Sequence, residues 1–137
     1  MTTRHILLMD KNPLISDLLS ELLEEELNVQ VTVPGTILED VTEIKGLQPD
    51  LILVALRHDV MLSQVWTCVQ HLKSDQATKD IPVVLYNGYT IELHEYYTQE
   101  CKAILTQPGI DFIFQPLDVD AFNSHIRSLL TNLPSII

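Results

Sequence analysis

The order of apolar and amphipathic segments constrains the fold most, because short apolar runs and segments with helical spacing alternate five times along the chain. Short apolar runs are typical of strands buried on both faces, and the amphipathic segments between them predict helices. Strands that alternate with helices form a parallel sheet covered on both sides. We therefore expect a three-layer α/β/α domain with a five-stranded parallel sheet.

The sequence predicts where these elements lie. The expected strands are His5–Met9, Val29–Val33, Leu51–Leu56, Val83–Tyr86 and Phe112–Phe114. The expected helices start at Asn12 and Pro13, at Thr36, near Leu62, after Thr90 and at Asp118. In the first helix, the apolar positions 14, 15, 18, 19, 22 and 23 are expected to face inward. The 137 residues suit one domain, 1–137, with a core at about 5–130 and an apolar tail at 131–137.

Charge and composition limit the partners that we expect. The net charge of −11 repels nucleic acid and anionic lipid, and no apolar run is long enough to span a bilayer. We therefore expect a cytoplasmic protein that binds neither nucleic acid nor membrane. Cys68 and Cys101 are isolated and are expected to be buried thiols. The five histidines lack the spacing of metal ligands, so no metal or cofactor is expected.

Functional residues of such sheets gather where the strands end, at the carboxyl edge. The residues that follow the predicted strands are Asp10 and Lys11, Ala55 to Asp59, Asn87 and Gly88, and Gln115 and Pro116. The loop after the first strand, DKNPLIS, contains no glycine and fits neither a P-loop nor a dinucleotide-binding fingerprint. These residues are therefore the candidates for any site, but the loop does not suit a nucleotide.

The segments around these positions resemble the receiver domains of bacterial response regulators. ILLMDKNP, PDLILVAL, IPVVLYNG and FIFQP are similar to the four signature segments of that CheY-like family, and they occur in the family's order. The resemblance covers about His5 to Leu130. It implies a flavodoxin-like topology and a role in two-component, or phosphorelay, signal transduction.

The resemblance also implies a phosphorylation site, from which this sequence departs. The family holds Mg²⁺ with two acidic residues, phosphorylates an aspartate after the third strand, and binds the phosphoryl group with Ser or Thr and Lys. Here Asp10 matches the first acid and Pro116 the proline after the lysine, whereas Lys11, Ala55, Asn87 and Gln115 replace the second acid, the phosphoacceptor, the hydroxyl residue and the lysine. The resemblance therefore implies a pseudo-receiver with no catalytic residue.

The replacements change both the chemistry and the charge of this pocket. The methyl group of Ala55 cannot attack phosphorus, and a lone carboxylate beside Lys11 is a poor Mg²⁺ site. Two interpretations of the remaining charges stay open: Asp10 pairs with Lys11 or Arg57 in place of a metal, or both cations point into solvent. Phosphorylation at another aspartate, such as Asp59, also stays open.

The resemblance places partner binding on the face formed by the fourth helix, the fifth strand and the fifth helix. Phe112 matches the family's switching aromatic residue, and it is either that switch or an ordinary core residue. Tyr96 and Tyr97 are adjacent on the predicted fourth helix, so both cannot face the core. Tyrosines are common at interfaces, and we expect one of the two to anchor a partner.

These observations favour a signalling module that works by protein–protein interaction and is not an enzyme. The expected partner is a histidine kinase or a downstream effector, with a homodimer through the same face as an alternative. A small-molecule binding or enzymatic domain on a flavodoxin-like fold is the second hypothesis, and a helical phosphotransfer protein using His71 is disfavoured by the strands. Only TNLPSII follows the fifth predicted helix, so no output domain is expected within the chain, which leaves open whether it is an excised domain.

Overall fold

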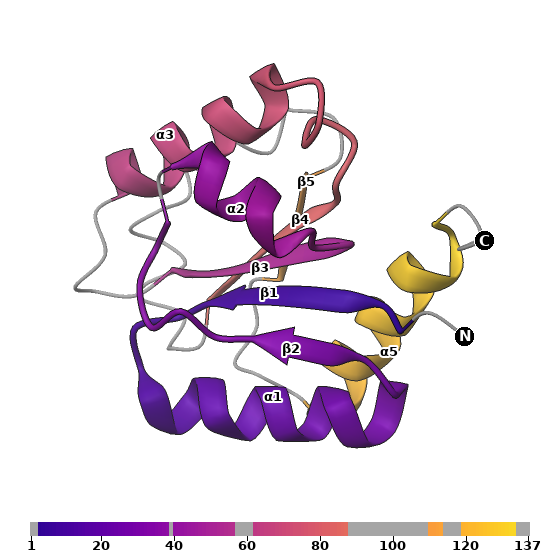
Figure 1. Cartoon of the computed structure of the whole chain (residues 1–137). Coiled ribbons are helices and arrows are strands. Elements are labelled where there is room, and N and C mark those ends of the chain that lie inside the picture. Colours follow the sequence, from indigo (N-terminus) through magenta and orange to yellow (C-terminus); the bar gives the residue numbers. More distant parts are fainter. Residues whose placement is uncertain (1–2, 39, 57–61, 88–109, 114–118, 134–137) are drawn as a thin grey trace.

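Five parallel strands form one sheet in the order β2-β1-β3-β4-β5, in a computed structural model that describes residues 3–38, 40–56, 62–87, 110–113 and 119–133 (Figure 1). The strands are β1 (His5–Met9), β2 (Gln30–Thr32), β3 (Leu51–Leu56), β4 (Val83–Asn87) and β5 (Ile110–Ile113). The most apolar strand, β3, lies in the middle, and the short β2 lies at an edge. The predicted five-stranded parallel sheet is therefore confirmed.

Four described helices cover the two faces of the sheet. They are α1 (Pro13–Leu27), α2 (Val41–Leu47), α3 (Leu62–Ser74) and α5 (Val119–Thr131). Helices α2 and α3 lie on one face, and α1 and α5 lie on the other (Figure 1). The helix predicted after Thr90 lies outside the described residues. None of the helices in the described part of the chain is long and apolar enough to span a membrane.

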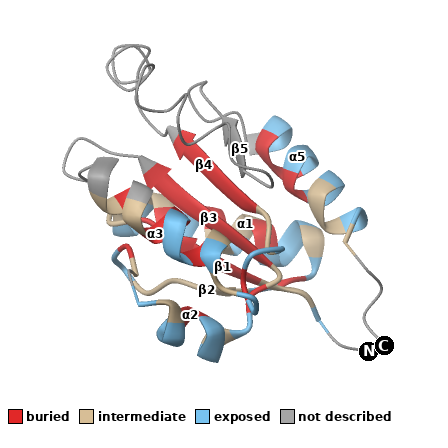
Figure 2. Cartoon of the chain, turned by 90° about the horizontal axis from the view of Figure 1, so that it is seen from above, coloured by how far each residue is buried: buried red, intermediate tan, exposed pale blue. Residues whose placement is uncertain are grey.

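The two faces of the sheet make two hydrophobic clusters, as a three-layer domain requires. Alternate residues of β1 and β3 divide between them, with Leu7 and Ile52 in one cluster and Leu8 and Leu53 in the other. Figure 2 shows the central strands buried and the outer faces of the helices exposed. The residues of α3 that helical spacing turns inward, Val65, Val69 and Leu72, are fully buried, and Cys68 on the same helix is buried, as expected.

Two predicted boundaries were wrong by two residues or more, while those of β2 and β4 differ by a single residue. Helix α2 begins at Val41, because the Asp40 side chain caps it by accepting a hydrogen bond of 2.8 Å from the Thr42 amide. Thr36 lies outside the helix, although Ile37 next to it is still buried. The fifth strand is Ile110–Ile113, two residues earlier than the apolar run indicated, because pairing with β4 decides its start.

The inward face of α1 was also predicted too broadly. The helix starts as expected, with the Asn12 side chain accepting from the amides of Leu14 and Ile15 at 3.0 and 3.3 Å. Leu19 and Leu23 are fully buried, but the side chains of Leu14 and Leu18 are 80% and 47% exposed. At 3.6 residues per turn, a stripe centred on Leu19 and Leu23 turns Leu14 away from the sheet. Two leucines therefore remain on the outer surface of the helix.

Polar contacts fasten the amino-terminal edge of the sheet. The His5 ring contacts the Leu47 carbonyl oxygen through Nδ1 at 2.8 Å and the Thr32 hydroxyl through Nε2 at 2.6 Å. The His5 amide donates to the Asp50 carboxylate at 2.8 Å, and Arg4 forms an ion pair with Asp50 at 3.5 Å. His5 therefore joins β1, β2 and the end of α2, which is the structural role expected for an isolated histidine.

Asn123 is an exception to the otherwise satisfied polar core. Its side chain is 3% exposed, and among the described residues neither amide atom has a hydrogen-bond partner. A buried polar group without a partner destabilises the folded state by about 1–3 kcal/mol. Asn123 lies four and seven residues before Arg127 and Leu130, so these positions share one stripe of α5.

We expect Asn123→Leu to raise the free energy of unfolding by about 1 kcal/mol, because leucine has a similar shape and no polar atom to desolvate. Chemical denaturation monitored by circular dichroism measures this change. Ser124→Leu is the matched control, because Ser124 is the exposed neighbour on the same helix and its replacement should change little. A loss of stability in Asn123→Leu would contradict the burial of an unpaired amide.

Candidate functional site

Asp10 is the best-defined residue at the carboxyl edge of the sheet. It follows β1 directly and is 1% exposed. Its Oδ1 atom accepts a hydrogen bond of 2.9 Å from the Asn12 amide, and its Oδ2 atom accepts one of 2.6 Å from the Tyr86 hydroxyl. Both carboxylate oxygens are therefore held by groups of the protein itself.

Tyr86 reaches Asp10 from the far side of the central strand. It lies in β4, where it is fully buried and pairs with Ala55 of β3, while Met9, just before Asp10, pairs with Val54. Strands β1 and β4 are separated by β3, and two strand spacings amount to about 10 Å. The Tyr86 side chain must therefore pass over Ala55 to bring its hydroxyl to Asp10.

The small side chain of Ala55 makes this crossing possible. Ala55 and Tyr86 are directly paired and belong to the same hydrophobic cluster, so their side chains lie on the same face of the sheet. Ala55 has only a methyl group there, which leaves room for the Tyr86 side chain to reach across towards Asp10. On its other side the Tyr86 ring packs edge to face against Phe122 of α5, with ring centroids 5.8 Å apart and planes inclined by 71°.

Of the two pairings considered for Asp10 from the sequence, the structure bears only on the one with Lys11. Lys11 is partly exposed, and among the described residues it forms no ion pair with Asp10. The carboxylate accepts hydrogen bonds from the Tyr86 hydroxyl and the Asn12 amide. The pairing with Arg57 remains a prediction, because Arg57 lies outside the described residues.

The other predicted site residues are located only in part. Asn87, predicted to follow the fourth strand, is instead the last residue of β4 and pairs with Leu56. Phe112 stands in β5, as expected, and pairs with Leu85 of β4. The side chains of Asn87 and Phe112 lie outside the described part. Gln115, Pro116, Tyr96 and Tyr97 lie outside it entirely, and so does Asp59. Their roles stay predictions.

The described donor set does not suit a magnesium ion. Mg²⁺ favours carboxylates and waters in octahedral geometry. At this edge the described residues offer the carboxylate of Asp10, the methyl group of Ala55 and the phenol of Tyr86. Both oxygens of the carboxylate already accept hydrogen bonds. Across the described residues, no group of three or more His, Cys, Asp or Glu side chains could hold a metal ion.

Sequence reasoning missed Tyr86, although a signal was present. The residue was assigned to a buried strand and its hydroxyl was given no role. A buried tyrosine needs a hydrogen-bond partner, and Tyr86 immediately precedes one predicted site residue, Asn87. Asp10 was predicted at the same edge of the sheet, so its carboxylate was an available partner for the tyrosine hydroxyl.

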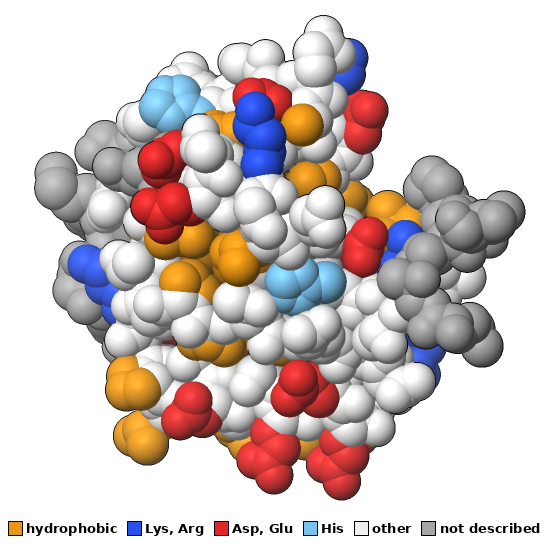
Figure 3. All heavy atoms as spheres, viewed as in Figure 1, with side chains coloured by type: hydrophobic (Ala, Val, Ile, Leu, Met, Phe, Trp, Pro, Cys, Tyr) orange, Lys and Arg blue, Asp and Glu red, His pale blue; other side chains and the backbone are white. Residues whose placement is uncertain are grey.

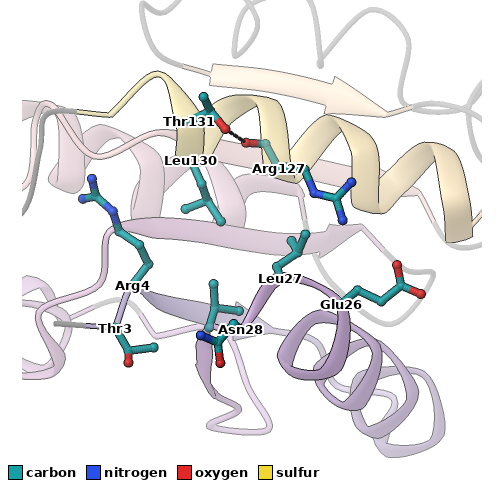
Figure 4. Close-up of a pocket in the computed structure, with 9 residues that line it drawn as sticks. Thr3, Arg4, Glu26, Leu27, Asn28, Arg127, Leu130 and Thr131 are labelled. Atoms are coloured by element: carbon teal, nitrogen blue, oxygen red, sulfur yellow. Dashed lines mark hydrogen bonds between the residues drawn. The ribbon is translucent and has the colours of Figure 1, made fainter. Parts of the chain in front are cut away.

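A cavity of about 450 Å³ lies at a different place, between the end of α1, the start of β1 and α5 (Figure 4). Leu27 and Leu130 line it from the two helices, and Arg4 and Arg127 stand at its sides. It brings together none of the residues that the sequence predicts for the site. We therefore regard the carboxyl edge around Asp10, Ala55 and Tyr86 as the candidate functional site.

The strand order and the position of this site define an open flavodoxin-like α/β fold. Two solved structures show that this is the fold of receiver domains. The signal receiver domain of a histidine kinase from Syntrophus aciditrophicus superposes with a TM-score of 0.73, at 22% identity and with 98% of each chain covered. The receiver domain of a DNA-binding response regulator from Colwellia psychrerythraea superposes with a TM-score of 0.74, at 17% identity, covering 94% of this chain and 99% of that one.

A curated protein resembles the sequence itself. The DNA-binding dual master transcriptional regulator RpaA of Synechocystis sp. strain PCC 6803 is 31% identical over an alignment of 134 residues, and the match covers 91% of this chain. The match covers 48% of RpaA, so the chain spans about half the length of that relative. No protein-family model matches the chain.

We expect Tyr86→Phe to lower the free energy of unfolding by about 1–3 kcal/mol, because it leaves a buried Asp10 oxygen without its donor. Urea denaturation of the wild type, Tyr86→Phe, Asp10→Ala and the double variant gives the coupling energy of the pair. The coupling should be at least about 1 kcal/mol. Additive effects of the two single substitutions would show that the hydroxyl and the carboxylate do not interact.

Proposed function

We propose that the chain is a receiver-like module of two-component signalling that acts by protein–protein interaction and does not depend on phosphorylation. The single observation that carries this proposal is the buried hydrogen bond from Tyr86 to Asp10 across Ala55. The receiver fold and the similarity to RpaA support the assignment to signalling. The proposal assigns the chain no enzymatic activity and no cofactor.

The chemistry of the pocket supports independence from phosphate. Phosphorylation needs a nucleophile at the end of β3, and Ala55 has none. The space that a phosphoryl group would enter is crossed by the Tyr86 ring, and the Asp10 carboxylate is already used. In the proposal, Asp10, Lys11, Ala55, Arg57, Asn87, Gln115 and Pro116 form a vestigial acceptor pocket.

A module without a phosphate cycle must take its signal from its partner. A histidine kinase or a downstream effector is the proposed class of partner, met in the cytoplasm. The face of the fourth helix, β5 and α5 is a proposed surface for it, with Tyr96, Tyr97 and Phe112 as its aromatic residues. A homodimer through that face is the alternative.

We expect no phosphorylation of the wild-type protein, because Ala55 supplies no nucleophile. Incubation with acetyl phosphate and Mg²⁺, followed by intact-mass measurement, tests this, with an active receiver domain as the positive control. Beryllofluoride with Mg²⁺ should cause no amide shifts around Asp10 and Ala55 in NMR spectra. A phosphorylated species, at Asp59 or elsewhere, would overturn the proposal.

We expect Ala55→Asp to remain unphosphorylated and to be less stable than the wild type. The new carboxylate would enter the space of the Tyr86 ring and face Asp10, and like charges close together repel. Overpacking of a core typically costs about 1–3 kcal/mol. Ala55→Ser is the matched control, because it adds one oxygen without a charge.

Phosphorylation of Ala55→Asp at the rate of an ordinary receiver would show that Tyr86, Lys11, Asn87 and Gln115 do not block the chemistry. Thermal unfolding of the same samples gives the stability, so that a variant which fails to fold is distinguished from one that folds and stays unmodified.

A further inference from the structure

Two of the chain's three arginines line the cavity between the ends of α1 and α5. Arg4 directly precedes β1, and Arg127 lies near the end of α5. The cavity therefore lies at the amino-terminal edge of the sheet, at the opposite end of β1 from Asp10. Its volume of about 450 Å³ falls within the roughly 300–1,000 Å³ that is usual for ligand sites in proteins. The acceptor pocket, which lies at the carboxyl edge, does not account for it.

This cavity has an apolar middle and charged sides. Leu27 of α1 and Leu130 of α5 line the middle, and Val29, which is 7% exposed, lines it from the segment before β2. In Figure 4, the side chains of Arg4 and Arg127 stand on opposite sides of the two leucines. An apolar surface flanked by guanidinium groups favours a ligand that has both an apolar body and an anionic group.

Hydrogen bonds hold the walls of the cavity in place. Helix α1 ends at Asn28, whose left-handed backbone, with φ 54°, turns the chain from the helix toward β2. The Gln30 amide then donates to the Arg4 carbonyl oxygen at 2.9 Å. On the other wall, the Thr131 hydroxyl donates to the Arg127 carbonyl oxygen at 2.8 Å. The cavity is therefore formed before any ligand enters, which lowers the entropy that binding costs.

The two arginines are not equivalent as ligand-binding groups. Arg4 forms an ion pair with Asp50 at 3.5 Å, so its charge is partly met within the protein. Arg127 is exposed, and among the described residues no carboxylate forms an ion pair with it. A guanidinium group binds a carboxylate through two parallel hydrogen bonds. Arg127 is therefore the group that can hold an anion, while Arg4 offers its aliphatic stem on the other side.

The surroundings of the cavity disfavour an inorganic anion. Glu26 also lines it, and the carboxyl ends of α1 and α5, which carry partial negative charge, lie beside it. Figure 3 shows acidic side chains along the lower edge of the molecule, where α1 runs in the same view. The net charge of the chain is −11. An anionic ligand must therefore gain free energy from apolar contact as well as from Arg127, which requires an apolar body.

We propose that the cavity binds a small amphipathic carboxylate, such as a fatty acid of medium chain length. The carboxylate accepts hydrogen bonds from the Arg127 guanidinium, and the hydrocarbon chain covers Leu27, Val29 and Leu130. Bound in this way, the ligand joins the end of α1 to the end of α5 and stabilises the folded chain by mass action. The inference goes beyond the proposed function, because it requires neither a phosphoryl group nor a protein partner.

The test is a titration of the isotope-labelled protein with octanoate, which supplies the carboxylate and the hydrocarbon chain together, below the concentration at which it forms micelles. We expect amide and methyl shifts centred on 26–29 and 127–131 and a rise in the melting temperature. Octanol lacks the charge and acetate lacks the chain, so each should bind at least about tenfold more weakly. Octylamine, whose charge is reversed, should cause no shifts at these positions.

Variants at three charged positions test the mode of binding. Arg127→Gln should weaken octanoate binding at least about tenfold, and Arg127→Lys should weaken it less, because lysine keeps the charge but not the two parallel bonds. Glu26→Gln should strengthen the binding, because it removes a negative charge from the cavity wall. Lys79→Gln removes an exposed cation from the turn before β4, so it is the matched control and should have no effect. Melting temperatures without ligand should stay unchanged, because these side chains are exposed.

Several outcomes would overturn the proposed site. Equal binding of octanol would show that only the apolar surface attracts the ligand, and equal weakening by Lys79→Gln would show that only net charge does. Shifts centred on Asp10 would move the site to the carboxyl edge. The absence of octanoate binding would exclude an amphipathic carboxylate, while the phosphorylation assay would still test the proposed function independently.

Discussion

The buried hydrogen bond between Tyr86 and Asp10 is the interaction on which the candidate site depends. Burying a carboxylate at 1% exposure is costly unless its oxygens find donors, and here a hydroxyl and a backbone amide supply them. The same bond links β4 to the end of β1 across the central strand. This contact therefore satisfies one oxygen of the buried acid and links the carboxyl ends of β1 and β4 across β3.

The fold could be predicted from the sequence because its signal is repeated. Each apolar run limits the strand that it forms, and five runs separated by helical segments leave few arrangements of a parallel sheet. The boundaries β1 His5–Met9 and β3 Leu51–Leu56 were predicted without error for this reason. The starts of α2 and β5 could not be predicted in this way. The start of α2 depends on which residue caps the helix, and the start of β5 depends on how that strand pairs with β4.

The sequence predicted where the site residues lie but not which of them form hydrogen bonds with one another. Asp10 and Ala55 were identified correctly as neighbours at the carboxyl edge, since parallel strands end together. What the sequence did not give was the partner of Asp10, because Lys11 is adjacent in the chain and Tyr86 is 76 residues away. The register that pairs Ala55 with Tyr86 is set by how β3 and β4 pair in the folded sheet, and the sequence alone does not determine it. Likewise, the apolar positions of α1 exceeded what one helical face can bury, and only packing decided which leucines stay outside.

A continuous set of contacts leads from the pocket to the outer face of α1. Tyr86 donates to one oxygen of Asp10, and the other oxygen accepts from the amide of Asn12. The Asn12 side chain in turn caps the helix by accepting from the amides of Leu14 and Ile15. The first turn of α1, which presents Leu14, is therefore held by the residue that an ordinary receiver uses to bind its metal. The carboxyl edge of the sheet and the first turn of α1 are therefore joined by a continuous chain of hydrogen bonds from Tyr86 through Asp10 to Asn12.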